Sequence, residues 1–376
     1  MARSIRPLEL GDVEQVASLY EHVARSGSRT PPPGLVDYFV RMFLEPPNAD
    51  LEIPSLVFVE PNGKVAGFMG SSVRPMRFEG EQIRAGICGQ LVTEPRARRQ
   101  AVGAFLIREY LLGRQELTIT DTASETVRRI WEGIGGETSQ LACIGWVRVF
   151  RPFTFAGDYF ERGERFAKLA RRARPLVGPL DRLAVRVRRA GILPDSPDWA
   201  ADPLTPQGLT ALLSSVGESV GLHPDYDEEF VAWLLDEVAA VQTRGQLVAR
   251  IVRRNGVVRG SYVYYLPTRG IVQVLQVAAR ERDVGDVLDD LFYDAWTRGA
   301  SAVQGRVEGH LREPLSKRRC LFHASGYLAL IHASNPEILH AIQAGKALLT
   351  RLEGEWWMGH HLEPFTTREA RRPVAR

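Results

Sequence analysis

Apolar positions in the first 151 residues follow the spacing of strands in some stretches and of helices in others. Positions 13 to 23 are apolar at intervals of three and four residues, which predicts a helix that Asp12 is placed to cap. Asn62-Gly63 between two β-branched runs predicts a hairpin. The predicted order is strand 4–10, helix 13–23, helix 35–44, strands 56–59, 65–71 and 83–93, helix 102–112, strand 117–121, helix 124–133 and strand 141–149.

The same order of elements recurs in the second half of the chain. The turn asparagine and a following glycine recur with it, because Asn62 and Gly67 match Asn255 and Gly260 at one offset of 193 residues. The two halves share few other residues, so the pattern predicts a structural repeat. Its elements are helices from 205 and over 228–241, strands 247–252, 257–265 and 272–278, helix 284–298, strand 303–307, helix 310–319 and strand 327–333.

Between the halves, from Pro152 to about Asp202, the strand pattern stops and arginine and proline become dense. Prolines break long helices, so we interpret this stretch as a domain connection. The prediction is an α/β fold with α+β mixed sheets, in which each domain holds a mostly antiparallel, twisted sheet flanked by helices. Its parts are a domain over 1–151, a basic connection over 152–202, a domain over 203–362 and a disordered tail over 363–376.

The composition is that of a globular protein, with 44% hydrophobic and 25% charged residues among 376. No apolar run reaches the roughly 18–20 residues that span a bilayer, and the first residues lack a signal-peptide core, so we expect a cytoplasmic protein. Cys88, Cys143 and Cys320 are far apart and odd in number. Their spacing fits neither zinc ligands nor a disulfide framework, so no metal is expected.

Positive charge is concentrated in one segment. Arg162–Arg189 holds ten basic and two acidic residues, a net of +8 in a chain whose total is +3. The remaining sequence therefore sums to −5, which argues against DNA binding by the protein as a whole. The segment also has apolar residues at helical spacing. Two interpretations stay open: contact with an anionic membrane surface or acidic partner, and packing across both domains with the arginines in solvent.

The most informative stretch leads from the strand at 83–93 through a basic turn into the helix at 102–112. The first N–H groups of a helix lack internal partners, and the helix dipole is positive there. Small residues would let a phosphate approach those groups, and arginines would add charge. A plain strand–turn–helix connection with surface arginines is the alternative. The residues concerned are Leu91, Val92, Arg98, Arg99, Gln100, Ala101, Val102, Gly103 and Ala104.

The run Arg98-Arg99-Gln100-Ala101-Val102-Gly103 resembles the coenzyme A signature of the GNAT acyltransferases: arginine or glutamine, two residues, glycine, one residue, then glycine or alanine. Its position after a helix pair and a meander also resembles that family. The resemblance covers residues 4–151 well and 203–357 loosely. It implies a signature-bearing strand that is splayed from its neighbour and binds the pantetheine arm through the main chain around Leu91 and Val92.

The next helix departs from the family pattern. The family's asparagine and tyrosine correspond here to Ser124 and Trp131, and the resemblance assigns both positions to the coenzyme site. An indole N–H cannot protonate a leaving thiolate as a tyrosine hydroxyl can. Ala101 replaces the first glycine of the signature, which is a tolerable exchange.

The family often has its base in the middle of the strand that corresponds to 83–93, and no carboxylate lies there in this sequence. Two carboxylates outside that strand are therefore the candidates for catalysis. Asp121, which ends the strand at 117–121, would face the splayed strands as base or acceptor anchor, or would instead cap the next helix. Glu94 would lie near the phosphates, as a base or as a simple loop charge. Water chains and main-chain polarisation are the remaining route for proton transfer.

At the equivalent place in the second half the sequence is Arg280-Glu281-Arg282-Asp283-Val284-Gly285-Asp286. Asp283 replaces the first glycine, and Asp286 follows it. Two unit charges 4 Å apart interact with about 4 kcal/mol at an effective dielectric of about 20, so carboxylates here would repel a pyrophosphate. We expect one coenzyme site per chain, in the first half.

The resemblance implies transfer of an acyl group from an acyl-coenzyme A, with acetyl-coenzyme A as the default donor, to an amine of unknown identity. Two other interpretations remain open at the level of the sequence. One is an aminoacyl-tRNA-dependent transferase of the same fold, which would use Arg162–Arg189 to bind tRNA. The other is a non-catalytic protein that senses an acyl-coenzyme A or serves as a scaffold.

Overall fold

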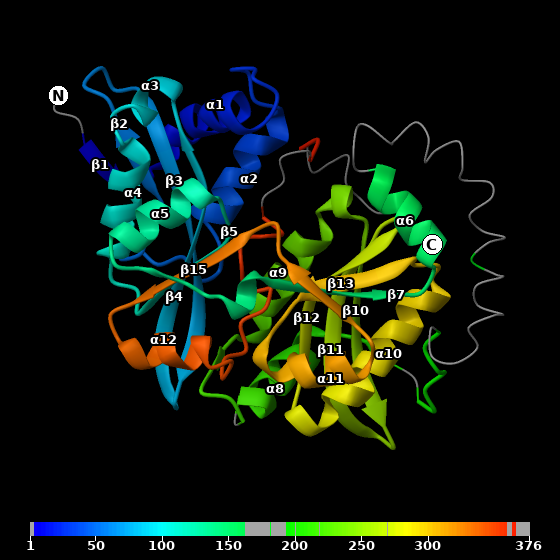
Figure 1. The fold of residues 1–376 in the computed structure, drawn as a ribbon. Helices are drawn as coiled ribbons and strands as arrows, with labels where there is room; N and C mark the ends of the chain where they lie inside the picture. The colour runs from blue at the N-terminus through cyan, green and yellow to red at the C-terminus, as the bar shows by residue number, and fades with distance from the viewer. Residues whose placement is uncertain are drawn as a thin grey trace.

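The structure is a computed structural model that describes residues 4–161, 181, 193–199, 201–217, 219–268, 270–358 and 363–365. It contains two mixed sheets that lie side by side (Figure 1). The first sheet has the order β1 (Ser4–Pro7), β2 (Leu56–Val59), β3 (Val65–Phe78), β4 (Glu81–Thr93), β5 (Leu117–Ala123), β15 (Leu328–Ala333) and β6 (Glu137–Thr138), with β9 (Leu222–Pro224) beside β3.

The second sheet repeats the meander of the first. Its order is β14 (Leu321–Ala324), β7 (Ile144–Val149), β13 (Ala302–Arg306), β12 (Ile271–Ala279), β11 (Val257–Leu266), β10 (Gln246–Arg254) and β8 (Ala201–Pro203). In each sheet one parallel pair stands among antiparallel neighbours. The parallel pair is β4 with β5 in the first sheet and β12 with β13 in the second. The predicted mixed, mostly antiparallel sheets are confirmed.

The two halves of the chain exchange one strand each. Strand β7 comes from the first half but lies between β13 and β14 of the second sheet. Strand β15 comes from the second half but lies between β5 and β6 of the first sheet, and Figure 1 shows it crossing in orange beside the cyan strands. The sequence predicts that each strand pairs within the sheet of its own half, and for β7 and β15 this prediction is wrong. Alternation of apolar and polar residues identifies a strand but does not specify which strand pairs with it, so the sequence does not reveal the exchange.

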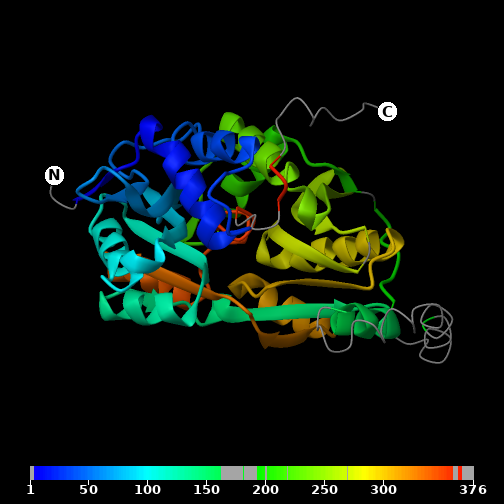
Figure 2. The same cartoon turned by 90° about the horizontal axis from the view of Figure 1, so that it is seen from above.

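Helices from both halves share one hydrophobic core. The pair α1 (Val13–Ala24) and α2 (Pro33–Phe43) and the pair α8 (Pro206–Gly217) and α9 (Glu228–Ala239) contribute to a single cluster of buried side chains, and Figure 2 shows them next to each other in blue and green. Helix α12 (Pro336–Gln343) contributes to the same cluster. One smaller cluster lies under α10 (Val284–Thr297) and α11 (Arg312–Lys317), and another lies under α3 (Pro95–Arg98), α4 (Val102–Leu111) and α5 (Glu125–Gly133). Helix α6 (Pro152–Glu161) packs through Phe155 against a further small cluster.

The repeated glycines of the sequence have equivalent structural roles. A Cβ atom added to Gly67 in β3 would lie 2.9 Å from Val102 of α4. A Cβ atom added to Gly260 in β11 would lie 2.7 Å from Val287 of α10. Both glycines therefore let a helix lie close against the sheet, which explains why they recur at one offset.

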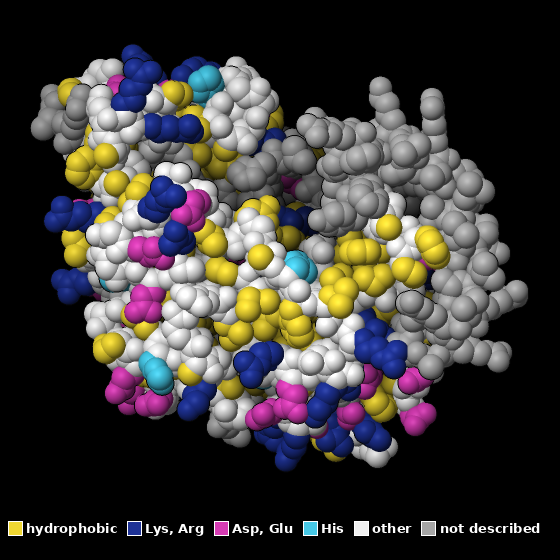
Figure 3. All heavy atoms as spheres, in the orientation of Figure 1, with side chains coloured by type: hydrophobic (Ala, Val, Ile, Leu, Met, Phe, Trp, Pro, Cys, Tyr) yellow, Lys and Arg dark blue, Asp and Glu magenta, His cyan; other side chains and the backbone are white. Residues whose placement is uncertain are grey.

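Strand β14 was not expected from the sequence, and it forms an exposed edge of the second sheet. Leu321 and Phe322 are 63% and 42% exposed, so neither face of this strand is buried as a strand pattern would require. Apolar side chains gather near the centre of the face in Figure 3.

Several predicted features are only partly covered. The basic segment Arg162–Arg189 lies outside the described residues except for Asp181, whose carboxylate accepts the Phe153 and Thr154 N–H groups at the start of α6. The tail predicted to be disordered from 363 begins with residues that are packed, since Glu363 and Phe365 are 2% and 3% exposed. Among the helices that the structure describes, none is long and apolar enough to cross a membrane.

Candidate functional site

Strands β4 and β5 pair only along part of their length. Their parallel register runs from Ala85↔Leu117 to Ile87↔Ile119, and both strands continue beyond it without pairing to each other. On its other side β4 has a bulge opposite β3, where Gln90 adopts a left-handed φ of 56°. A bulge turns and bends a strand locally. The two strands therefore separate from Cys88 and Thr120 onward, as the resemblance implied.

The opening between these strands is a cavity of about 250 Å³. Its walls come from β3, from the ends of β4 and β5, from α1, α4 and α5, and from Glu355 of the C-terminal part of the chain. The lining residues are Tyr20, Ala24, Met69, Cys88, Gly89, Gln90, Leu91, Val92, Ile107, Thr120, Thr122, Ala123, Ser124, Val127, Trp131 and Glu355. The cavity thus contains Leu91, Val92, Ser124 and Trp131, all of which the sequence had assigned to the site.

The N-terminus of α4 lies at the end of β4. Ala101 adopts a left-handed φ of 56° before the helix and its side chain makes no capping hydrogen bond, so within the described part of the chain the first N–H groups of the helix have no capping partner. Arg98, Arg99, Gln100 and Ala101 are exposed on the turn. A Cβ atom added to Gly103 would meet nothing closer than Thr93 at 3.9 Å, so the approach to these N–H groups is open.

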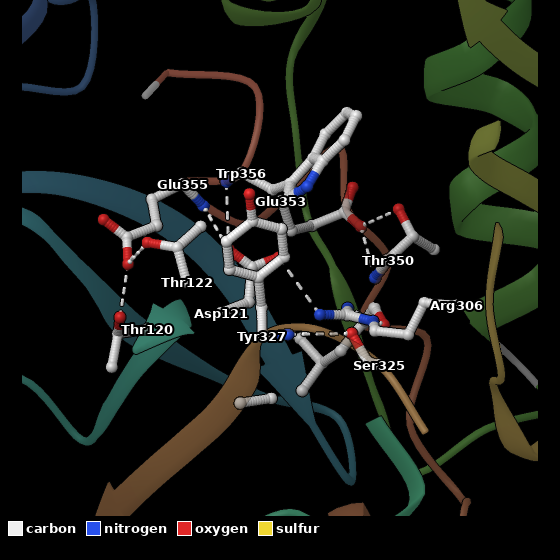
Figure 4. A network of polar contacts seen from close by, with 12 residues as sticks. Thr120, Asp121, Thr122, Arg306, Ser325, Tyr327, Thr350, Glu353, Glu355 and Trp356 are labelled. Carbon is white, nitrogen blue, oxygen red and sulfur yellow. Dashed lines mark hydrogen bonds and ion pairs between the residues drawn. The ribbon is translucent and has the colours of Figure 1, made fainter. Parts of the chain in front are cut away.

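Glu355 is a buried carboxylate in the cavity wall that the sequence analysis did not identify. It belongs to the segment Leu349–Met358, here called the return segment, which follows α12 and runs back between the two sheets. Glu355 Oε1 accepts hydrogen bonds from the hydroxyls of Thr120 and, at 2.8 Å, Thr122 on β5 (Figure 4). A Cβ atom added to Gly89 would overlap Glu355 Oε2. The carboxylate therefore touches the main chain of β4 where the strands separate.

The environment of Glu355 favours its protonated form. Burial, and then the negative charge of Asp121, raise the pKa of Glu355 to about 7, and the two threonine hydroxyls offset only part of that shift. Tyr20 and Cys88 also face it, and burial raises the pKa of both above their ordinary values, so neither is charged near neutral pH. A carboxylate with a pKa near 7 can both accept and release a proton at neutral pH.

Asp121 lies under the return segment rather than in the open part of the crevice. Its Oδ1 accepts the backbone N–H groups of Glu355 at 2.9 Å and Trp356 at 3.0 Å. Its Oδ2 accepts a hydrogen bond from Arg306 Nη1 at 3.1 Å, and Figure 4 shows this pair beside the return segment. Arg306 in turn donates to the Leu349 carbonyl. Asp121 thus holds the return segment in place, and the helix-capping alternative belongs to Ser124, whose Oγ accepts the Val127 N–H.

Glu94, the second candidate, is held by two cations. Arg29 Nη1 and Lys64 Nζ lie 2.8 and 2.9 Å from its Oε1. Arg29, followed by Lys64, lowers the pKa of Glu94 to about 2. A carboxylate with so low a pKa is a weak proton acceptor at neutral pH. Glu94 is not among the residues that line the cavity.

Trp131 is fully buried at the inner end of the cavity. Its indole N–H donates to the Ile331 carbonyl of β15 at 2.9 Å, so the exchanged strand fixes the ring. The position that holds the family's tyrosine is therefore an apolar wall, and its single donor is already used.

The equivalent place in the second half is occupied by the protein's own charges. Asp283 accepts a hydrogen bond from Arg259 at 2.8 Å, and Asp286 lies 3.2 Å from Arg254. A Cβ atom added to Gly285 would lie 2.9 Å from the Arg318 guanidinium, so this helix start is crowded. A pyrophosphate placed at this helix start would meet two carboxylates and the Arg318 side chain.

Solved structures with a similar fold include known and probable N-acyltransferases. One is a GCN5-related N-acetyltransferase from Anabaena variabilis, with a TM-score of 0.58 and 10% identity over 89% of this chain and 73% of that one. Another is an Enterococcus faecalis protein of unknown function described as a probable N-acyltransferase, with a TM-score of 0.56 and 8% identity over 88% and 72%. A third is Saccharomyces cerevisiae N-myristoyltransferase with bound myristoyl-CoA, with a TM-score of 0.51 and 8% identity over 88% and 82%.

No protein-family model matches the sequence, and no curated relative was found for it. At identities of 8–10% the structural likeness establishes the fold and does not by itself transfer an activity.

Proposed function

We propose that this chain, which has the fold of the GCN5-related N-acetyltransferases, transfers an acyl group from acyl-coenzyme A to an amine. The observation that carries the proposal is the separation of β4 and β5 beside the uncapped start of α4. One donor molecule can use both features at once, with its arm between the strands and its pyrophosphate at the helix.

The arm of coenzyme A suits the opening between the strands. Beyond Ile87 the edge of β4 that faces β5 has main-chain groups that no longer pair with that strand. Pantetheine carries two amides in an extended chain, and an extended ligand can pair with a free strand edge through such groups. The five residues from Gly89 to Thr93 are four steps of about 3.3 Å and so span roughly 13 Å, which gives the arm a path from α4 to the inner cavity.

The pyrophosphate suits the start of α4. The free N–H groups of the first helical turn and the positive end of the helix dipole attract an anion. Arg98 and Arg99 are exposed there, and among the described residues no carboxylate is paired with either side chain. Glu94, the nearest acid in sequence, is already neutralised by Arg29 and Lys64.

The cavity favours a short acyl group. Its volume of about 250 Å³ has to hold the thioester end of the arm as well as the acyl chain. Met69, Ile107 and Trp131 form apolar walls, and Trp131 is held rigidly by β15. We infer acetyl-coenzyme A as the donor. The second half, with its own charges at the equivalent helix, serves to complete the acceptor side and to anchor the return segment.

Acetyl-coenzyme A binding is the first test of this proposal, with Gly103→Glu as the disabling variant. A ligand at a hundred times its Kd stabilises the folded protein by about 2.7 kcal/mol, which a thermal shift detects. Glutamate in a first helical turn stabilises the helix, so the unliganded variant should melt no lower than wild type. Its carboxylate would lie over the N–H groups, and we expect acetyl-coenzyme A to bind at least roughly tenfold more weakly.

Gly103→Ala is the matched control, because a Cβ atom at this position has room. It should keep the thermal shift of wild type. Absence of any shift in wild type at millimolar acetyl-coenzyme A would contradict the proposal. Release of the coenzyme thiol on addition of members of a panel of amines would then identify the acceptor class, whereas binding without thiol release would favour a sensor.

A further inference from the structure

We propose that Glu355 is the general base of the reaction, supplied to the coenzyme crevice of the first half by the C-terminal end of the chain. This inference rests on the proposed acyl transfer and adds a catalytic residue to it. Among the residues that the structure describes, Glu355 of the return segment is the one carboxylate that lines the cavity between β4 and β5.

The position of the carboxylate matches that of the reacting atoms. An arm that pairs with β4 along Leu91 and Val92 brings its thioester to the point where the strands meet, beside Gly89 and Thr120. Glu355 Oε2 is packed against Gly89 at that point. An amine that attacks the thioester carbonyl would therefore have its N–H within reach of this carboxylate, directly or through one water molecule.

The transfer step balances with the groups present. The amine nitrogen forms a bond to the thioester carbon while Glu355 accepts one proton from that nitrogen. The carbon–sulfur bond then breaks, and its electron pair leaves with the sulfur of coenzyme A. Glu355 then gives that proton to the thiolate, directly or relayed through one water molecule, which returns the carboxylate to its initial state.

The residues around Glu355 fix the orientation of its carboxylate and determine which charges act on it. The hydroxyls of Thr120 and Thr122 fix Oε1, so the carboxylate is oriented before the substrates bind. The titratable and charged groups that face it are Asp121 on β5, Cys88 on β4, Tyr20 on α1 and Tyr38 on α2. Burial raises the pKa of the thiol and of both phenols, so Asp121 is the charge that acts on Glu355 near neutral pH.

The other buried carboxylates nearby are engaged elsewhere. Asp121 accepts two backbone N–H groups and Arg306, which makes it a positioning residue for the return segment. Glu353 accepts the N–H and hydroxyl of Thr350 and the amide of Gln276, and it does not line the cavity. Glu353 therefore offers a matched control: a buried glutamate of the same segment, two residues away.

The experiment compares wild type with Glu355→Gln and Glu353→Gln in the full chain. Acetyl-coenzyme A binding is measured by thermal shift, and thiol release from acetyl-coenzyme A is measured with an amine panel and with water as nucleophile, between about pH 5.5 and 9. We expect the wild-type rate to rise with pH around a midpoint near 7. Glu355→Gln should bind acetyl-coenzyme A but lose this rise and roughly 10²–10⁴-fold of the rate. Glu353→Gln should keep the rise.

The outcomes separate the two proposals. A wild type that shows no stabilisation by acetyl-coenzyme A would refute the donor site itself. A wild type that binds it without releasing thiol to any nucleophile, or a Glu355→Gln variant that keeps the pH-dependent rise, would refute the base. An infrared carboxyl band that titrates near pH 7 in wild type and is lost in Glu355→Gln would support the assignment without relying on turnover.

Gly89→Ala gives a second test that leaves the carboxylate in the sequence. The added Cβ atom would overlap Glu355 Oε2, so the side chain must move away from β4. We expect this variant to retain acetyl-coenzyme A binding and to lose rate as Glu355→Gln does. Full activity of a folded Gly89→Ala variant would contradict the proposed position of the base.

Discussion

At the scale of single residues, Glu355 shows a conflict between stability and chemistry. Its pKa is about 7 in the folded protein, against 4.5 for an ordinary glutamate. Between these values the folded state binds more protons than the unfolded state, so the free energy of unfolding falls as pH rises through this range. Ionised Glu355 therefore destabilises the fold at neutral pH. Residues that are kept in unfavourable states are often found at functional sites.

Glu355→Gln removes this titration, because glutamine can still accept the threonine hydroxyls and carries no charge. We expect the variant to be more stable than wild type. The difference in free energy of unfolding between the two should increase by about 2–3 kcal/mol between about pH 5 and pH 8. Denaturant unfolding at the two pH values measures it. The exposed Glu109→Gln should change stability by less than about 0.5 kcal/mol at both. A gain that is equal at the two pH values would show that the pKa of Glu355 is not raised.

At the scale of elements, the start of α4 carries local strain. Ala101 has a φ of 56°, a conformation that costs an L-residue other than glycine about 1–2 kcal/mol. The family signature has glycine there, and the structure shows the physical reason. The chain must turn in the left-handed region to leave the first N–H groups of the helix uncovered.

Ala101→Gly should therefore raise the stability of the protein slightly, by roughly 0.5–1 kcal/mol, after allowance for the extra freedom of glycine in the unfolded chain. The same exchange at Ala104, inside the helix, should lower it by roughly 0.5–1 kcal/mol. Urea unfolding of the two variants measures the contrast. If both substitutions destabilise the protein, Ala101 is not strained in solution.

Elements were also the level at which the sequence was most informative. Helices and strands follow from local spacing, so α4 was expected at 102–112 and is observed at Val102–Leu111. A local signature was enough to predict the separation of β4 from β5 and the place of Leu91 and Val92 beside the opening. A local signature could not identify Glu355, because Glu355 lies 234 residues from Asp121, the residue whose side chain accepts its backbone N–H. The one local signal was a pair of glutamates within the apolar run Leu352–Met358, which suggests buried carboxylates.

At the scale of the whole molecule, the exchange of β7 and β15 makes each half dependent on the other. Strand β15 pairs with β5 from Leu328↔Ala123 to Ala333↔Leu117 and supplies the carbonyl that fixes Trp131. Strand β7 is an interior strand of the second sheet. The crevice also takes its proposed base from the return segment. Each half by itself would lack an interior strand of its sheet, and the first half would also lack Glu355.

The two halves should therefore fold together and not apart. Fragment 1–151 would expose the β5 edge and leave β7 without a sheet, so we expect it to aggregate when expressed alone, as unpaired strand edges do. Fragments 1–192 and 193–376 contain all the paired strands between them, and co-expression should yield a soluble complex that acetyl-coenzyme A stabilises. Size-exclusion chromatography and thermal shift measure both outcomes. A monomeric 1–151 fragment that melts cooperatively and binds acetyl-coenzyme A would contradict this dependence, because the first half would then build its crevice without β15.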